Sequence, residues 1–169
     1  MKGGATARAA APLEGSGVRR AAPLRREVVR RSSEMTAPID ACAGAARALL
    51  PGKTVPRTAV IRAAVAAWLD AAEDANHEPS EVAIQQIRTS LCDERGLHAH
   101  PQYWPPEMAA RLDLFASTAE RALGREVSRS AVARTAIAVW LAAAAHRPPA
   151  DVAQAIRAAF VKRGRRPKQ

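Results

Sequence analysis

One segment of the chain occurs twice, and this repeat constrains the fold more than any other feature. Residues 56–69 and 128–141 align without gaps at an offset of 72 positions. Large apolar side chains recur at matching positions: Val60 with Val132, Val65 with Ile137, Trp68 with Trp140, and Leu69 with Leu141. Such self-similarity indicates that one supersecondary unit is present in two copies.

Both copies have the pattern of an amphipathic helix. Their apolar residues recur every three or four positions, which places them on one helical face. Alanine is abundant and is the best helix former, whereas aromatic residues make up only 4% of the chain. Each copy has candidate N-cap residues, Thr54 or Thr58 in the first and Ser128 or Ser130 in the second.

The repeat extends in both directions and predicts three helices per unit. An apolar stripe precedes each copy and ends at Pro51-Gly52 in the first unit and at Gly124 in the second. After each copy, residues 81–88 and 151–157 share a Val-Ala start followed by Gln, Ile and Arg. We therefore expect an all-α, mainly helical fold of two tandem repeats, with a short N-terminal β-strand as an optional addition. The units would pack about an approximate twofold axis, with both repeat tryptophans near a shared core.

These patterns divide the chain into five segments. We expect a disordered basic arm at 1–35, a first helical repeat at 36–92, a linker at 93–107, a second helical repeat at 108–161 and a basic tail at 162–169. The linker is rich in proline, histidine and glycine, and proline and glycine interrupt regular structure.

The net charge of +10 lies at the two ends of the chain. Residues 1–35 contain eight Lys or Arg and three Glu, residues 162–169 contain five Lys or Arg and no acid, and the middle is neutral. Basic segments attract polyanions by counterion release without having to fold, which favours a nucleic-acid partner over a role in solubility alone. Two other interpretations of the first 34 residues stay open, an organelle transit peptide or translation that starts at Met35.

No motif in the sequence indicates catalysis, a cofactor, a metal or a membrane span. There is no nucleophile–base pattern and no glycine-rich phosphate loop, so we expect neither an enzyme nor a small-molecule substrate. Cys92, His98 and His100 lie close together but lack an obvious fourth zinc ligand, and Cys42 lies on an apolar helical stripe. Two cysteines favour a reducing compartment, and no apolar run reaches the roughly 20 residues of a membrane helix.

Part of each unit resembles the helical half of ribbon-helix-helix DNA-binding proteins. In the second unit the resemblance is carried by Leu112-Asp113, Ala116, residues 127–130, Ala136-Ile137 and Leu141. In the first unit it is carried by residues 55–58, Ile61-Arg62-Ala63, Val65 and Leu69. Some relatives in that family, including plasmid-transfer proteins, carry both units in one chain, and this sequence is similar to that arrangement.

The resemblance implies a strand before the first helix of each unit. In that family the two strands pair into a ribbon that enters the major groove, and the N-terminus of the second helix lies against a phosphate. Residues 24–31 stand at the distance expected for the first strand. Residues 98–104 fit the second position less well, because Pro101 lacks a backbone donor and is tolerated only at an edge. The third helix is an addition to the family's minimal unit.

The resemblance and the basic segments together give a set of candidate DNA contacts. They are Arg25, Arg26, Arg30 and Arg31 in the first strand, Arg57, Thr58, Arg62, Arg129, Ser130 and Arg134 at the helix starts, and Arg163, Arg165 and Arg166 in the tail. An equally weighted alternative is that the helix arginines pair with nearby acids such as Asp40 or Glu126.

We therefore expect a double-stranded DNA-binding protein of the bacterial cytoplasm or nucleoid that regulates transcription or plasmid maintenance. It would act as an intramolecular pseudo-dimer or as a homodimer of such chains. The alternative is a helical protein-interaction module, antitoxin-like or an adaptor, that does not bind DNA. The neutral middle of the chain and its alanine-rich helix faces suit that second function.

Overall fold

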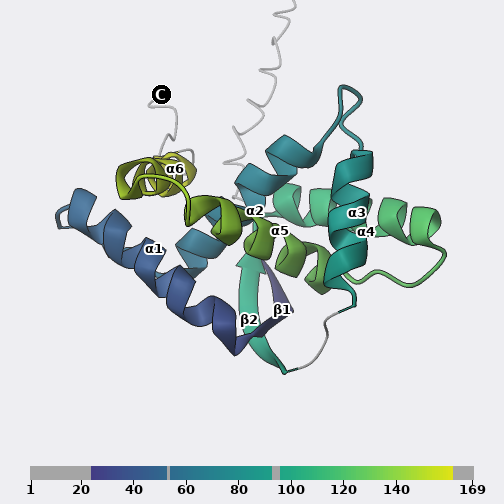
Figure 1. The fold of residues 1–169 in the computed structure, drawn as a ribbon, viewed down its shortest axis with the longest axis horizontal. Helices are drawn as coiled ribbons and strands as arrows, with labels where there is room; N and C mark the ends of the chain where they lie inside the picture. Colours follow the sequence, from purple (N-terminus) through teal and green to yellow (C-terminus); the bar gives the residue numbers. More distant parts are fainter. Residues whose placement is uncertain (1–23, 53, 93–95, 162–169) are drawn as a thin grey trace, which may run out of the picture.

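The computed structural model describes residues 24–52, 54–92 and 96–161, and within them one order of elements occurs twice (Figure 1). In the first half, strand β1 (Arg25–Ser32) and a 3-10 turn (Ser33–Met35) precede α1 (Thr36–Leu49), α2 (Arg57–Ala72) and α3 (Glu81–Ser90). In the second half, β2 (Leu97–Trp104) precedes α4 (Pro106–Leu123), α5 (Arg129–Ala144) and α6 (Pro149–Val161). The mainly helical class is confirmed, and the optional N-terminal strand is present. The expected disordered arm at 1–35 is wrong for residues 25–35, which form β1 and the 3-10 turn because β1 pairs with a second strand. Residues 1–23 of that arm and the tail at 162–169 lie outside the described residues.

The two strands form an antiparallel ribbon, and this corrects the expectation of a linker at 93–107. Every residue of β1 has a partner in β2, from Arg25 opposite Trp104 to Ser32 opposite Leu97. Pro101 is tolerated because each strand of a two-stranded sheet is an edge strand, with backbone groups that meet no neighbouring strand. Burial of its inward side chains, Gln102 and Trp104, further stabilises β2.

Local signals explain where the helices begin and end. Helix α1 ends just before Pro51-Gly52, as the sequence predicts. Helix α4 ends at Gly124, whose φ of +63° is readily adopted by glycine and whose N–H donates to the carbonyl of Glu120. Helix α5 begins at the N-cap Ser128, whose hydroxyl accepts from the N–H of Ala131. The N-cap of α2 is Pro56, without a side-chain hydrogen bond, so the expected caps Thr54 and Thr58 are wrong.

The two halves are intertwined rather than placed side by side. Strand β1 packs against α5 of the second half, and β2 packs against α2 of the first half. The third helices also cross over, because α3 packs on α4 and α5 while α6 packs on α1 and α2. Figure 1 shows α2 and α5 at the centre of this arrangement, with the ribbon at its lower edge. Each half therefore buries its apolar surface largely against the other.

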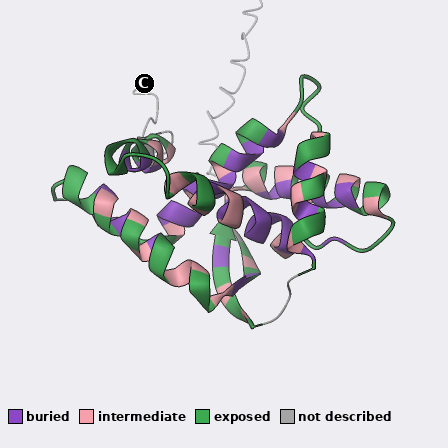
Figure 2. Cartoon of the chain, viewed as in Figure 1, coloured by how far each residue is buried: buried purple, intermediate pink, exposed green. Residues whose placement is uncertain are grey.

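The buried residues form one hydrophobic cluster that draws on both halves. Figure 2 shows where buried segments, in purple, lie along the helices and strands. The ring of Trp68 in α2 meets that of Phe115 in α4, with centroids 5.3 Å apart, and the indole N–H donates to Gln86 of α3. Trp140 is also buried, as the sequence predicts for both repeat tryptophans. Seven successive residues of α5, 131–137, are buried, so this stretch of α5 has no solvent-facing side. Small alanine side chains let such helices pack closely.

We expect Phe115→Ala to lower the free energy of unfolding by about 3–5 kcal/mol, because it removes a fully buried ring from the contact with Trp68. Denaturant unfolding followed by circular dichroism measures the change. The neighbouring Leu114, which is 39% exposed, provides the matched control, and Leu114→Ala should change the free energy by less than about 1 kcal/mol. Equal effects of the two substitutions would contradict the packing described above.

Candidate nucleic-acid interface

The outward face of the β1–β2 ribbon is the most distinctive exposed surface of the described chain. Strand alternation places one set of side chains toward the helices and the other toward solvent. The exposed set is Arg26, Val28 and Arg30 on β1, opposite Tyr103, Pro101 and Ala99 on β2. Two guanidinium groups and three apolar side chains larger than alanine therefore share one open face.

The N-terminus of α5 lies directly beside β1. The backbone N–H of Arg30 donates to the hydroxyl of Ser130 at 2.8 Å, which fixes the edge of the ribbon to the first turn of the helix. Arg129 donates to Glu27 of β1 at 3.0 Å and to Asp113 of α4 from its Nε at 2.6 Å. A hollow between the ribbon and this helix end is lined by Arg30, Ser128, Arg129 and Ser130, among others.

Arg129 is held by two carboxylates in a partly enclosed position. Its side chain is 15% exposed and that of Glu27 is 19% exposed. Burial acts to lower the pKa of Arg129, but the hydrogen bonds to Asp113 and Glu27 outweigh it and leave the pKa raised. A role as a structural tie between β1, α4 and α5 therefore accounts for Arg129 without any ligand.

The N-terminus of α2 lies beside β2 and is more open. Arg57 forms a two-point contact with Asp40 of α1, at 2.5 and 2.6 Å, and its side chain is 53% exposed. The hydrogen bonds to Arg57 lower the pKa of Asp40, and those to Asp40 raise the pKa of Arg57. Arg62 donates from Nε to the carbonyl of Tyr103, which ties α2 to the ribbon. The expected pairing of Arg57 with Asp40 is confirmed.

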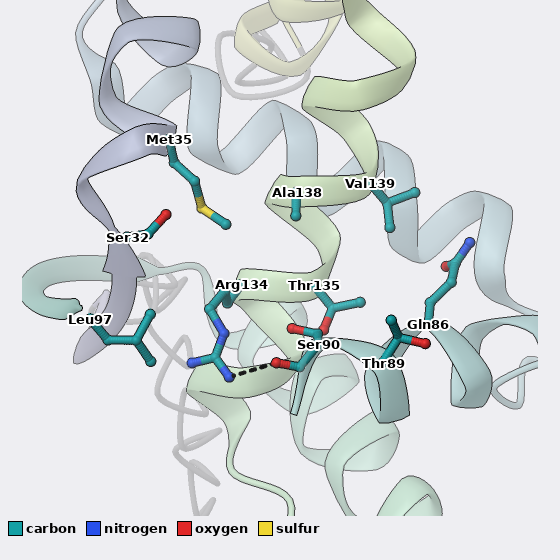
Figure 3. A pocket seen from close by; sticks show the side chains of 10 residues that line it. All are labelled: Ser32, Met35, Gln86, Thr89, Ser90, Leu97, Arg134, Thr135, Ala138 and Val139. Atoms are coloured by element: carbon teal, nitrogen blue, oxygen red, sulfur yellow. Dashed lines mark hydrogen bonds between the residues drawn. The ribbon is translucent and has the colours of Figure 1, made fainter. Parts of the chain in front are cut away.

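Two predicted contact residues lie inside the protein, and we withdraw them as DNA contacts. Arg31, on the inward face of β1, is 4% exposed, and burial lowers its pKa. Arg134 is also 4% exposed. It lines a pocket between the ribbon, α3 and α5, where its Nη2 donates to the carbonyl of Ser90 (Figure 3). Strand alternation and the tight packing of α5 put these side chains out of reach of a duplex.

The remaining predicted residues occupy mixed positions. Thr58 is half-buried in the first turn of α2, and Ser130 is half-buried beside Arg30. Arg25 belongs to β1, but its side chain is not among those described. Arg163, Arg165 and Arg166 lie beyond the described residues. Of the thirteen predicted contacts, Arg26 and Arg30 are thus the strand arginines whose exposure on the ribbon is established.

Sequence reasoning missed the residues of β2 that complete the surface. Ala99, Pro101 and Tyr103 alternate with the inward His100, Gln102 and Trp104. The alternation of polar and apolar residues over 98–103 indicates a strand, but taken alone it would turn the apolar set inward, whereas in the structure that set faces solvent. The partners of Arg129 were also missed. Glu27 lies 102 positions away from it, whereas Asp113 stands 73 positions after Asp40 and could have been found from the repeat.

A cluster of basic groups lies on the inward side of the ribbon near α2. His100 is half-buried, and burial, with added repulsion from Arg31, His98 and Arg57, lowers its pKa.

No group of three or more His, Cys, Asp or Glu residues that could hold a metal is found in the part of the chain that the structure describes. Among those residues no helix has the length and hydrophobicity to cross a membrane.

No family model, no curated protein and no solved structure matches this chain. The geometry of the ribbon and its flanking helices is therefore the basis for the function proposed below.

We expect Arg129→Ala to lower the free energy of unfolding by about 2 kcal/mol, because it leaves the enclosed Glu27 without its cation. Arg57→Ala is the matched control at the equivalent first position of α2, and it should cost less because that pair is largely exposed to water. Denaturant unfolding at low salt measures both. A larger loss for Arg57→Ala than for Arg129→Ala would show that the burial assigned to these pairs is wrong.

The lowered pKa of His100 makes stability depend on pH. The folded state binds this proton less tightly than the unfolded chain, so acidification from above pH 6.5, the ordinary histidine value, should lower the free energy of unfolding. The loss ends once the pH falls below the folded-state pKa. We expect His100→Gln to remove this acid-dependent decrease in the free energy of unfolding, which denaturant unfolding between pH 5 and pH 8 measures. His146→Gln, at an exposed position after α5, is the control for loss of an imidazole, and an unchanged profile in His100→Gln would refute the assignment.

Proposed function

We propose that this chain binds double-stranded DNA by inserting the outward face of its β1–β2 ribbon into the major groove. The observation that carries the proposal is that face, on which Arg26 and Arg30 project from a two-stranded ribbon flanked by the N-termini of α2 and α5. A two-stranded ribbon fits the major groove, and arginine is the side chain that contacts guanine edges most often. Exposed helix N-termini beside the ribbon suit the adjacent phosphates.

The arrangement corresponds to the expectation raised by the resemblance to ribbon-helix-helix proteins. We infer that the chain is a single-chain pseudo-dimer made of two duplicated units. Val28 and Pro101, which face each other in the ribbon, stand 73 positions apart, and the same offset separates Asp40 from Asp113. Both aspartates bind the first arginine of the following helix. These matches support an approximate twofold axis passing between Val28 and Pro101.

The exposed apolar side chains also favour the ribbon as the binding surface. Six large hydrophobic residues are exposed in the described chain. Val28 and Tyr103 lie on the ribbon, and Leu24 stands immediately before β1. The other three, Leu49, Val82 and Leu114, are spread over three helices. Single exposed apolar residues are normal, whereas a group on one face marks an interaction site. This distribution favours the ribbon over the outer helix faces as the binding surface. A role in regulating transcription or plasmid maintenance follows as part of the proposal.

A salt titration tests the proposal directly. We expect the full-length protein to bind a duplex DNA with a logarithmic affinity that falls linearly with logarithmic salt concentration. Duplex RNA of the same sequence should bind more weakly, because its deep, narrow major groove does not admit a ribbon. Fluorescence anisotropy measures both, and absence of salt-sensitive binding to duplex DNA would refute the proposal.

The double variant Arg26→Ala/Arg30→Ala should lower affinity for duplex DNA by at least about tenfold, because it removes both guanidinium groups of the ribbon face. Arg157→Ala is the matched control, since Arg157 is exposed on α6, which lies away from the ribbon in Figure 1. It should change affinity by no more than about twofold, because salt screens the attraction between the duplex and a single distant charge. Circular dichroism confirms that the variants fold, and equal losses in all variants would place binding outside the ribbon.

A further inference from the structure

The two strands of the ribbon are equivalent in position but not in chemistry. The offset of 73 positions relates Arg26 to Ala99, Val28 to Pro101 and Arg30 to Tyr103. All six side chains lie on the outward face. Both guanidinium groups therefore come from β1, and at the equivalent positions β2 presents a methyl group and a phenol.

A half-turn about the approximate axis would exchange these groups. The place occupied by Arg26 would then be taken by Ala99, and the place of Arg30 by Tyr103. A guanidinium can donate two hydrogen bonds to the O6 and N7 acceptors of guanine, whereas alanine and tyrosine cannot. Rotating the protein on a fixed duplex thus replaces the two-point guanine contacts of both arginines with a methyl group and a single phenol hydroxyl.

The helix N-termini that flank the ribbon also differ between the β1 side and the β2 side. Beside β2, Arg57 of α2 is half exposed and has one carboxylate partner, and α2 has no side-chain cap. Beside β1, Arg129 of α5 has two carboxylate partners, and Ser128 caps the helix. The position equivalent to Glu27 is His100, so the second carboxylate is absent from the α2 side. One end presents a half-exposed guanidinium that is paired with Asp40, and the other presents the hydroxyls of Ser128 and Ser130, each of which accepts one backbone N–H.

We propose that this chain recognises a non-palindromic duplex in one orientation, with Arg26 and Arg30 each contacting a guanine and with Pro101 and Tyr103 against apolar groove atoms such as thymine methyls. The inference rests on the proposed function and deepens it by stating the class of site. Arg26 and Arg30 are four residues apart on one strand, about 13 Å, which corresponds to roughly four base-pair steps. The site should therefore hold two G·C pairs at about that separation, without a symmetric second copy.

Selection from a pool of duplexes with a randomised centre tests the class of site, using the full-length protein. We expect a non-palindromic consensus with two separated guanines. Arg26→Ala should abolish the preference at one guanine and Arg30→Ala at the other, each lowering affinity for the selected duplex by roughly 5- to 100-fold. Affinity for a scrambled duplex should change far less, and Arg157→Ala should leave both the consensus and the affinity intact.

Directed cleavage tests the orientation. An iron chelate is attached to Ser33→Cys, an exposed position just after β1, in a background carrying Cys42→Ala and Cys92→Ser. We expect cleavage at one end of the selected duplex only, with a preference of at least roughly 20-fold given two lost guanine contacts in the reversed complex. Equal cleavage at both ends would show that the protein binds in both orientations.

The outcomes separate this inference from the proposed function. A palindromic consensus, or salt-dependent binding to every duplex without any consensus, would overturn the inference while leaving DNA binding in place. Absence of duplex binding would overturn the proposed function itself. A non-palindromic consensus whose guanines persist in Arg26→Ala and Arg30→Ala would also overturn the inference, because another group would then make those contacts.

Discussion

The pairing of β1 with β2 is the interaction on which the rest of the structure depends. It joins strands whose nearest paired residues, Ser32 and Leu97, are 65 positions apart, and it brings each strand against a helix of the other half. Because side chains alternate along a strand, the register also decides which arginines meet solvent. A shift of one residue would expose Arg31 and bury Arg30, and the surface proposed to meet DNA would be lost.

Six arginines of the described residues that were candidate DNA contacts occupy three environments, and these differ in what the side chain can still do. Arg26 and Arg30 lie exposed on the ribbon, Arg57 and Arg129 are bound to carboxylates, and Arg31 and Arg134 are buried. A bound or buried guanidinium must first lose existing contacts before it can meet a phosphate, which costs free energy. The positive charge of the sequence therefore overstates the number of groups that are ready to contact a nucleic acid.

Much of the fold could be predicted from local pattern. The repeat, the three helices of each unit and the end of α1 before Pro51-Gly52 all follow from apolar periodicity and from residues that stop helices. Pro101 argues against a strand at β2, yet pairing with β1 and burial of Trp104 outweigh that single missing donor. The contact of Arg129 with Glu27 was beyond prediction for another reason, since Glu27 approaches it only when the chain has folded back across the ribbon.

The sequence by itself determined that helices form and where they stop, because these depend on residues a few positions apart. Only the tertiary structure decided that the strands pair, which of their faces is open and which arginines are exposed. Those outcomes depend on contacts between segments far apart in the chain, and the free energy of such contacts comes from burying Trp68, Phe115 and Trp104 in one shared interior.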